Sequence, residues 1–73
     1  MISRLSETAI LKPPFAFSEL AECAAREVRM RQNVYPNRVM TGRMTQKQAT
    51  RELQMMDEIA RYLRALAERE RLL

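Results

Sequence analysis

The chain has 73 residues, of which 47% are hydrophobic and 30% charged, so it is long enough for one small globular domain. With no His and a single Cys, the sequence excludes Cys/His zinc clusters, a catalytic histidine and an intrachain disulfide, and no cofactor is expected. No apolar run approaches 18 residues, so we expect neither a membrane span nor a signal peptide, and a cytoplasmic location in which Cys stays reduced.

Residues 1–17 are predicted to form an extended N-terminal arm. The Pro13-Pro14 pair favours an extended backbone and interrupts any helix before it. The residues around the pair are too apolar for a solvated tail, so we expect the arm to lie across the rest of the chain or across a second subunit. These apolar residues are Ile10, Leu11, Phe15 and Phe17.

A first helix is predicted over residues 18–41, with Ser18 as its N-cap. Proline lacks the backbone N–H that a helix needs, so Pro36 is expected to kink or break this helix. Gly42, the only glycine, stands where a left-handed residue commonly ends a helix. The apolar residues recur with steps of three and four, which predicts a buried stripe that includes Cys23 as a small core residue. The stripe comprises Leu20, Cys23, Met30 and Val34.

A second helix is predicted over residues 46–71, and its start is the clearest signal in the sequence. Thr45 and Gln48 have the spacing of a capping box, in which each side chain accepts a hydrogen bond from the other residue's backbone N–H. The apolar residues that follow are separated by steps of 4, 3, 4, 3 and 4, as in a coiled-coil seam. They are Ala49, Leu53, Met56, Ala60, Leu63 and Ala67. The short connection between the helices predicts an all-α antiparallel hairpin over residues 18–73.

A lone hairpin buries only one stripe on each helix, and the second helix has more apolar surface than one stripe needs. Ile59 and Leu66 widen its seam along one edge. We therefore expect a homodimer with a four-helix arrangement, with a different protein partner as the alternative. The residues predicted to form the dimer seam are Leu53, Met56, Ile59, Ala60, Leu63 and Leu66.

Two acidic residues interrupt the predicted apolar faces. Glu27 lies on the apolar side of the first helix, and Arg31 follows it by one turn in the order that favours an ion pair. Glu52 occupies the corresponding edge of the second helix. We interpret the three as a structural ion cluster across the hairpin. A general acid and base pair is the weaker alternative, because the sequence offers no nucleophile, His or metal site nearby.

The positive charge belongs to the middle of the chain, where residues 26–51 carry a net charge of +6. Four basic residues around the predicted turn are interpreted as the partner-binding surface: Arg38, Arg43, Lys47 and Arg51. They could face an acidic protein or nucleic acid, or only solvent. A helix of about 26 residues with a coiled-coil seam does not suit a compact three-helix DNA reader. A second possible binding surface is rich in methionine: Met40, Met44, Met55 and Met56.

Residues 22–59 resemble a family of short, mostly uncharacterised phage and prophage proteins. The resemblance lies in a Val-Tyr-Pro step at residues 34–36 and a Gly-Arg-Met-Thr turn at residues 42–45. It implies an accessory protein of a temperate phage, and small proteins of this kind often bind and block a protein of the bacterial host. We therefore expect a non-enzymatic protein that modulates or inhibits a host protein. The alternative is a small nucleic-acid-binding regulator that acts through the basic turn.

Overall fold

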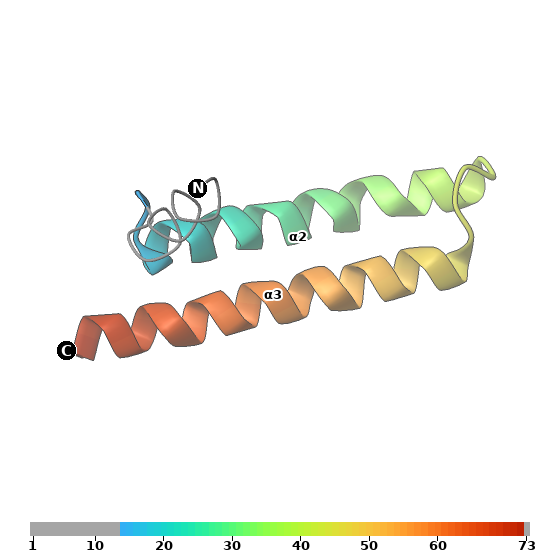
Figure 1. The fold of residues 1–73 in the computed structure, drawn as a ribbon. Helices are drawn as coiled ribbons and strands as arrows, with labels where there is room; N and C mark the ends of the chain where they lie inside the picture. The colour runs from blue at the N-terminus through green and yellow to red at the C-terminus, as the bar shows by residue number, and fades with distance from the viewer. Residues whose placement is uncertain (1–13, 73) are drawn as a thin grey trace, which may run out of the picture.

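Two α-helices side by side form the part of the chain that the structure describes. The structure is a computed structural model that describes residues 14–72. Helix α2 (Phe17–Met40) and helix α3 (Gln46–Leu72) run antiparallel, and the end of α3 lies beside the start of α2 (Figure 1). The predicted all-α helical hairpin is confirmed. Most of the predicted arm, residues 1–13, lies outside the described residues.

Helix α2 begins earlier than its predicted cap. Ala16, with an extended backbone, is the N-cap residue, and the Glu19 side chain accepts a hydrogen bond from the Ala16 N–H at 3.0 Å. Ser18 lies within the first turn and is exposed, so the prediction that it caps the helix is wrong. Glu19 replaces the cap because its carboxylate satisfies a free backbone N–H at the positive end of the helix dipole. Phe17 therefore belongs to the helix.

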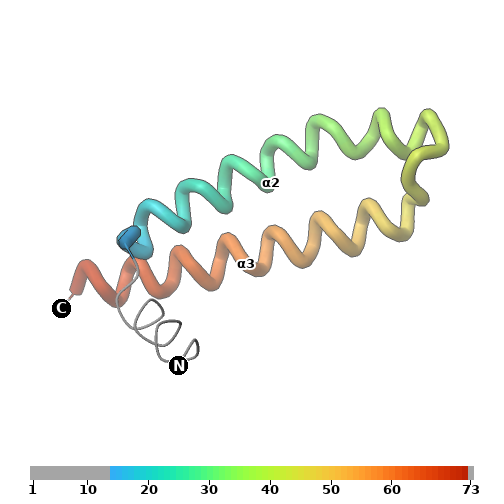
Figure 2. Tube along the Cα trace, turned by 45° about the horizontal axis from the view of Figure 1, so that its top comes forward, coloured from blue at the N-terminus to red at the C-terminus, as the bar shows by residue number. Residues whose placement is uncertain are grey.

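Pro36 does not break α2, which runs on to Met40. Proline leaves the carbonyl four residues before it, that of Gln32, without a helical partner. Gln32 and Pro36 are both exposed, so water can bond this carbonyl and the helix can continue. In Figure 2 the axis of α2 changes direction over its last turns.

The hairpin turns through a Schellman motif, with Thr41 as the C-cap residue of α2. Gly42 has a φ of +77°, the left-handed conformation predicted for it, and its N–H donates to the Val39 carbonyl at 3.1 Å. The Arg43 N–H donates to the Arg38 carbonyl at 2.9 Å. These bonds satisfy carbonyls that the end of a helix leaves free, and they reverse the chain within a few residues.

Helix α3 begins with the capping box that the sequence predicts. The Gln48 N–H donates to the Thr45 hydroxyl, and the Thr45 N–H donates to the Gln48 side-chain oxygen, both at 3.0 Å. Ala49 follows directly and is 2% exposed, so the cap fixes α3 with this small side chain against α2. No proline or glycine interrupts the helix before its end at Leu72.

The core between the helices is small and rich in alanine. On α2 the side toward α3 carries Ala21, Ala24 and Tyr35, which are buried, and Val28, which is half-buried. Cys23 and Met30 are exposed, so the prediction that they belong to the buried stripe is wrong. Alanine lets the two backbones approach closely, and the stripe with alanines in it is therefore the one that α3 covers.

Candidate functional site

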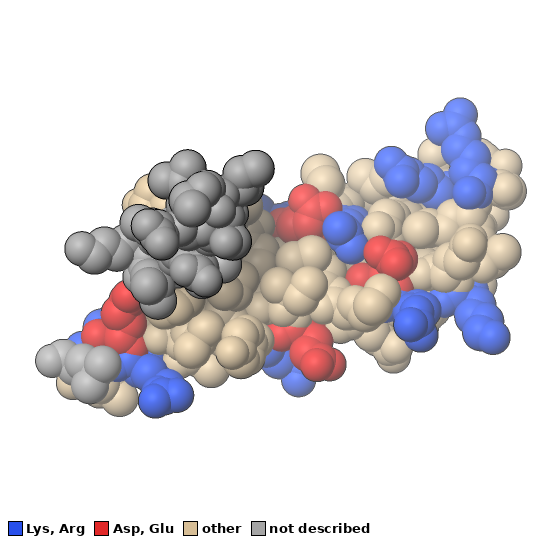
Figure 3. Space-filling view, in the orientation of Figure 1, with Lys and Arg blue, Asp and Glu red and all other residues tan. Residues whose placement is uncertain are grey.

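The basic residues predicted to bind a partner lie around the turn of the hairpin, and we call this group the basic end. It comprises Arg38, Arg43, Lys47 and Arg51. All four side chains are exposed, and none forms an ion pair with another residue between 14 and 72. Figure 3 shows Lys and Arg side chains gathered at the end of the molecule that carries the turn. No acidic residue occurs between positions 28 and 51, so nothing within this segment neutralises them.

The backbone holds two of these arginines close to each other. In the Schellman motif, Arg38 and Arg43 occupy the two positions that commonly form an apolar contact. Here both positions carry guanidinium groups, and the hydrogen bond between their main chains fixes the distance between the two Cα atoms. Two like charges placed together by the fold repel each other, and an anionic group of a partner would relieve that repulsion.

Lys47 and Arg51 project from a different side of the basic end. They are one turn apart on α3, and at about 100° per residue both point away from the buried Ala49 and therefore away from α2. The basic end thus surrounds the turn instead of forming one flat face. A partner with several acidic groups around a pocket or a rim would match this arrangement better than a flat surface.

The ring of Tyr35 contacts one arginine of the basic end and one of the ion cluster. Its side chain is buried, and both Arg31 and Arg38 place their guanidinium carbon 5.9 Å from the centre of its ring. Such cation–π contacts hold the two arginines close to the ring. The sequence did not reveal this role for Tyr35, although the spacing of four to Arg31 and three to Arg38 puts all three on one helix face.

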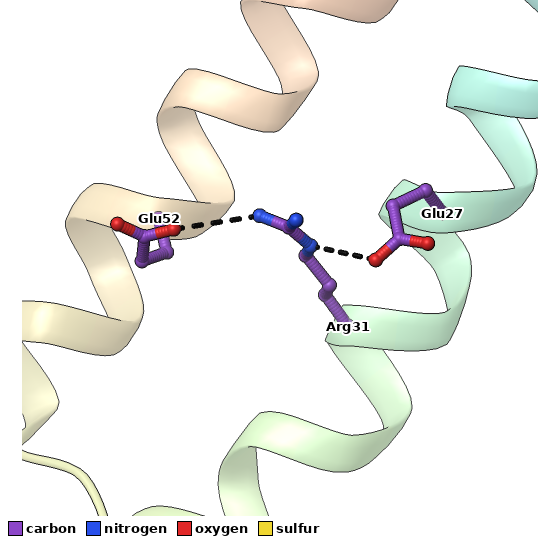
Figure 4. A network of polar contacts seen from close by, with 3 residues as sticks. All are labelled: Glu27, Arg31 and Glu52. Atoms are coloured by element: carbon purple, nitrogen blue, oxygen red, sulfur yellow. Dashed lines mark hydrogen bonds and ion pairs between the residues drawn. The ribbon is translucent and has the colours of Figure 1, made fainter.

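Next to this ring, the structure places the three residues of the predicted ion cluster in contact (Figure 4). The Arg31 Nε donates to Glu27 at 2.9 Å on the same helix, and an Arg31 Nη lies 3.5 Å from Glu52 on α3. The hydrogen bond to Glu27, with the nearby charges, raises the pKa of Arg31 above its ordinary value. Arg31 therefore keeps its charge at neutral pH and links the carboxylates of the two helices.

The predicted dimer seam divides into two rows in the structure. Leu53, Met56, Ala60 and Leu63 are half-buried on the side of α3 that carries the buried Ala49, which is the side that α2 covers. The other two residues lie on a flank of α3 together with two residues outside the predicted seam. We call this second row the apolar flank: Met55, Ile59, Tyr62 and Leu66.

The apolar flank is largely open to solvent. Met55 is 41% exposed, Ile59 48% and Tyr62 66%, while Leu66 is half-buried. Met55, Ile59 and Tyr62 also line an open hollow along α3. The steps between the four residues are 4, 3 and 4, so this row has the same spacing as the first one. That spacing was the signal in the sequence for a second seam.

Between residues 14 and 72, no group of three or more His, Cys, Asp or Glu side chains is placed to hold a metal ion. Neither of the two described helices is long and apolar enough to cross a membrane. Comparison of the chain with protein-family models, curated proteins and solved structures finds no match. The resemblance to short phage proteins therefore stays a prediction.

Proposed function

We propose that this chain is a non-enzymatic binding protein that modulates or inhibits another protein through its basic end. The observation that carries the proposal is the exposure of Arg38, Arg43, Lys47 and Arg51 at one end of the molecule, without an acidic partner among the described residues. The fold holds these charges close together at a cost in repulsion. A surface of this kind suits an acidic protein, which it would attract and orient by electrostatic complementarity.

The resemblance to phage accessory proteins suggests in which cell the chain would act and on what kind of target. On that ground the target is a protein of a bacterial host, and the site of action is the host cytoplasm. A helical hairpin with a charged tip is suited to occupy an acidic surface of an enzyme or a regulator and to exclude its normal partner. Such action requires binding alone, and no group of the basic end has to take part in chemistry.

A charge-reversal variant tests this proposal. Replacing Arg43, Lys47 and Arg51 by Glu should abolish capture of the target from a nuclease-treated bacterial lysate. The free energy of unfolding should change by less than about 1 kcal/mol, because exposed charges contribute little to stability. Circular dichroism during urea unfolding measures the second quantity on the same preparation.

The matched control reverses three arginines elsewhere on α3. Arg61, Arg64 and Arg69 are exposed, and replacing them by Glu changes the net charge by the same amount. This control should still capture the target. Normal capture by the basic-end variant would show that the basic end is only a solvated surface, and unfolding of that variant would place its residues in an internal ion network.

Nucleic acid is the second candidate for the basic end, since six basic residues and no acidic one occur between positions 28 and 51. The two candidates differ in their response to salt. Binding to a phosphate backbone releases counterions, so the affinity for a nucleic-acid duplex would fall by orders of magnitude between 50 and 200 mM salt. Capture that survives nuclease treatment and falls far less than this over the same range supports a protein target.

A further inference from the structure

The ion cluster shows which flanks of the two helices lie on the same side of the hairpin. Arg31 and Glu52 meet across the helices at 3.5 Å, so the flank of α2 with Arg31 and the flank of α3 with Glu52 face the same way. At about 100° per residue, the whole apolar flank lies within about 80° of Glu52 on α3. On α2, Leu20, Val34 and Cys23 lie within about 80° of Arg31. Both helices therefore present apolar residues on this side, which we call the cluster side.

The opposite side of the hairpin is polar. At about 100° per residue, the following exposed residues point away from the cluster side: Ser18, Glu22, Arg29, Thr50, Arg61, Arg64 and Glu68. The hairpin is thus amphipathic over its middle, beyond the apolar stripe that each helix buries against the other, while exposed charged residues lie on the cluster side at its two ends: Arg38 near the turn and Glu70 near the end of α3. In Figure 3 uncharged side chains cover much of the middle of the hairpin, with charged ones among and beside them.

The core between the two helices is small, so the hairpin needs further apolar burial, which the cluster side can supply. The buried residues in the described part of the chain are three alanines and one tyrosine, and no large side chain there is fully buried. Two helices alone give a domain of this length little apolar burial, and natural chains of such length commonly add a further element or a second subunit. The cluster side offers the apolar surface for such an addition.

The distribution of charge selects a second copy of the chain as the occupant. In the half of the hairpin near the turn, residues 28–56 carry six basic residues and one acidic residue, which gives +5. In the other half, residues 14–27 and 57–72 carry five basic and seven acidic residues, which gives −2. Two copies placed side by side in opposite directions bring each positive half against a negative half, whereas parallel copies bring the two +5 halves together.

We propose that two copies of this chain pack their cluster sides together, with the hairpins antiparallel, into a four-helix bundle. Met55, Ile59 and Tyr62 then pack in the centre of the bundle. The Glu27–Arg31–Glu52 cluster bridges the two helices on the same side, so it lies within the interface, where its charges stay paired with one another. Lys47 points away from the cluster side, so the dimer leaves this part of both basic ends accessible. The two turns lie at opposite ends of the bundle.

Sedimentation equilibrium of the wild-type protein at tens of micromolar tests the association. The expected mass is twice 8.6 kDa. A variant with Met55→Glu and Ile59→Glu should run as the monomer at the same concentration, because it places four carboxylates in the centre of the bundle. The matched control, Met40→Glu with Thr50→Glu, makes the same change in charge at two exposed residues that point away from the cluster side, and it should remain a dimer. A folded wild-type monomer, or dissociation of the control to the same extent, would overturn the proposal.

Spin-label distances test the antiparallel arrangement and do not depend on a destabilising variant. The chain has one cysteine, so Cys23→Ser with Gln46→Cys places one label on each copy, at the start of α3 beside the turn. Helix α3 has 27 residues and is about 40 Å long, so antiparallel copies should place the labels about 35–40 Å apart. A distance below about 20 Å would show that the turns lie together and that the arrangement is wrong.

Discussion

Arg31 is the side chain that links the two helices by charge, and it also contacts the ring that supports the basic end. It pairs with Glu27 and Glu52 and lies over Tyr35. Replacing Arg31 by Met keeps an apolar stem of similar length but leaves two acidic side chains without a counter-charge. We expect the free energy of unfolding to fall by about 1–2 kcal/mol, more than for an exposed pair, because the Arg31 side chain is only 25% exposed. Urea unfolding followed by circular dichroism measures this loss.

Arg61→Met is the control for this prediction. Arg61 pairs with Asp57 on the same helix, and its side chain is 80% exposed. This ion pair lies within one helix, and water can bond both of its exposed side chains when the pair is broken. The loss of stability should therefore be clearly smaller than for Arg31→Met. Equal losses in the two variants would show that the cluster contributes no link between the helices.

The elements show why the sequence predicts some parts of the fold better than others. The capping box of α3 is fixed by two residues three apart, and such local chemistry is visible without knowledge of the fold. The buried face of α2 depends on where α3 lies. Leu20 and Val34 belong to one apolar row, while Ala21 and Ala24 belong to another, and both rows have helical spacing. The larger side chains favour the first row, but the close approach of two backbones selects the row with the alanines.

Gly42 is the position at which one backbone angle determines how the two helices meet. Its φ of +77° strains any residue with a Cβ, although no atom within 4 Å would obstruct that Cβ. Gly42→Ala should therefore destabilise the protein by about 1–2 kcal/mol through the backbone alone. Thermal or urea unfolding at a fixed protein concentration measures the effect.

Asparagine tests whether the backbone conformation is the cause. Asn adopts the left-handed conformation more readily than Ala, so Gly42→Asn should lose less stability than Gly42→Ala although its side chain is larger. If the Asn variant is the less stable of the two, the cost comes from contacts of the side chain and not from φ.

At the scale of the whole molecule, the sequence predicted the ion cluster as a contact across the hairpin, but it predicted the basic end only as a set of residues and not their positions around the turn. Residues 28–51 carry no acidic residue, and that is visible in the sequence alone. The positions of the basic side chains around the turn depend on the Schellman motif and on the directions in which the residues at the start of α3 point. The division of the predicted dimer seam into two rows depends on which row α2 covers. Long-range placement is thus the part that required the structure.

The small core of the hairpin and the proposed dimer together predict that folding depends on protein concentration. If only the dimer is stable, each dimer unfolds to two chains, and a hundredfold increase in concentration stabilises it by about 2.7 kcal/mol. For a unit of twice 73 residues this should raise the Tm by roughly 5–10 °C, which calorimetry or circular dichroism measures between about 2 and 200 µM. The variant with Met55→Glu and Ile59→Glu should lose this concentration-dependent transition, because it cannot form the dimer and the hairpin alone is not stable. A wild-type Tm that stays constant over this range would mean that the hairpin is stable alone, although the buried residues between positions 14 and 72 are only three alanines and one tyrosine.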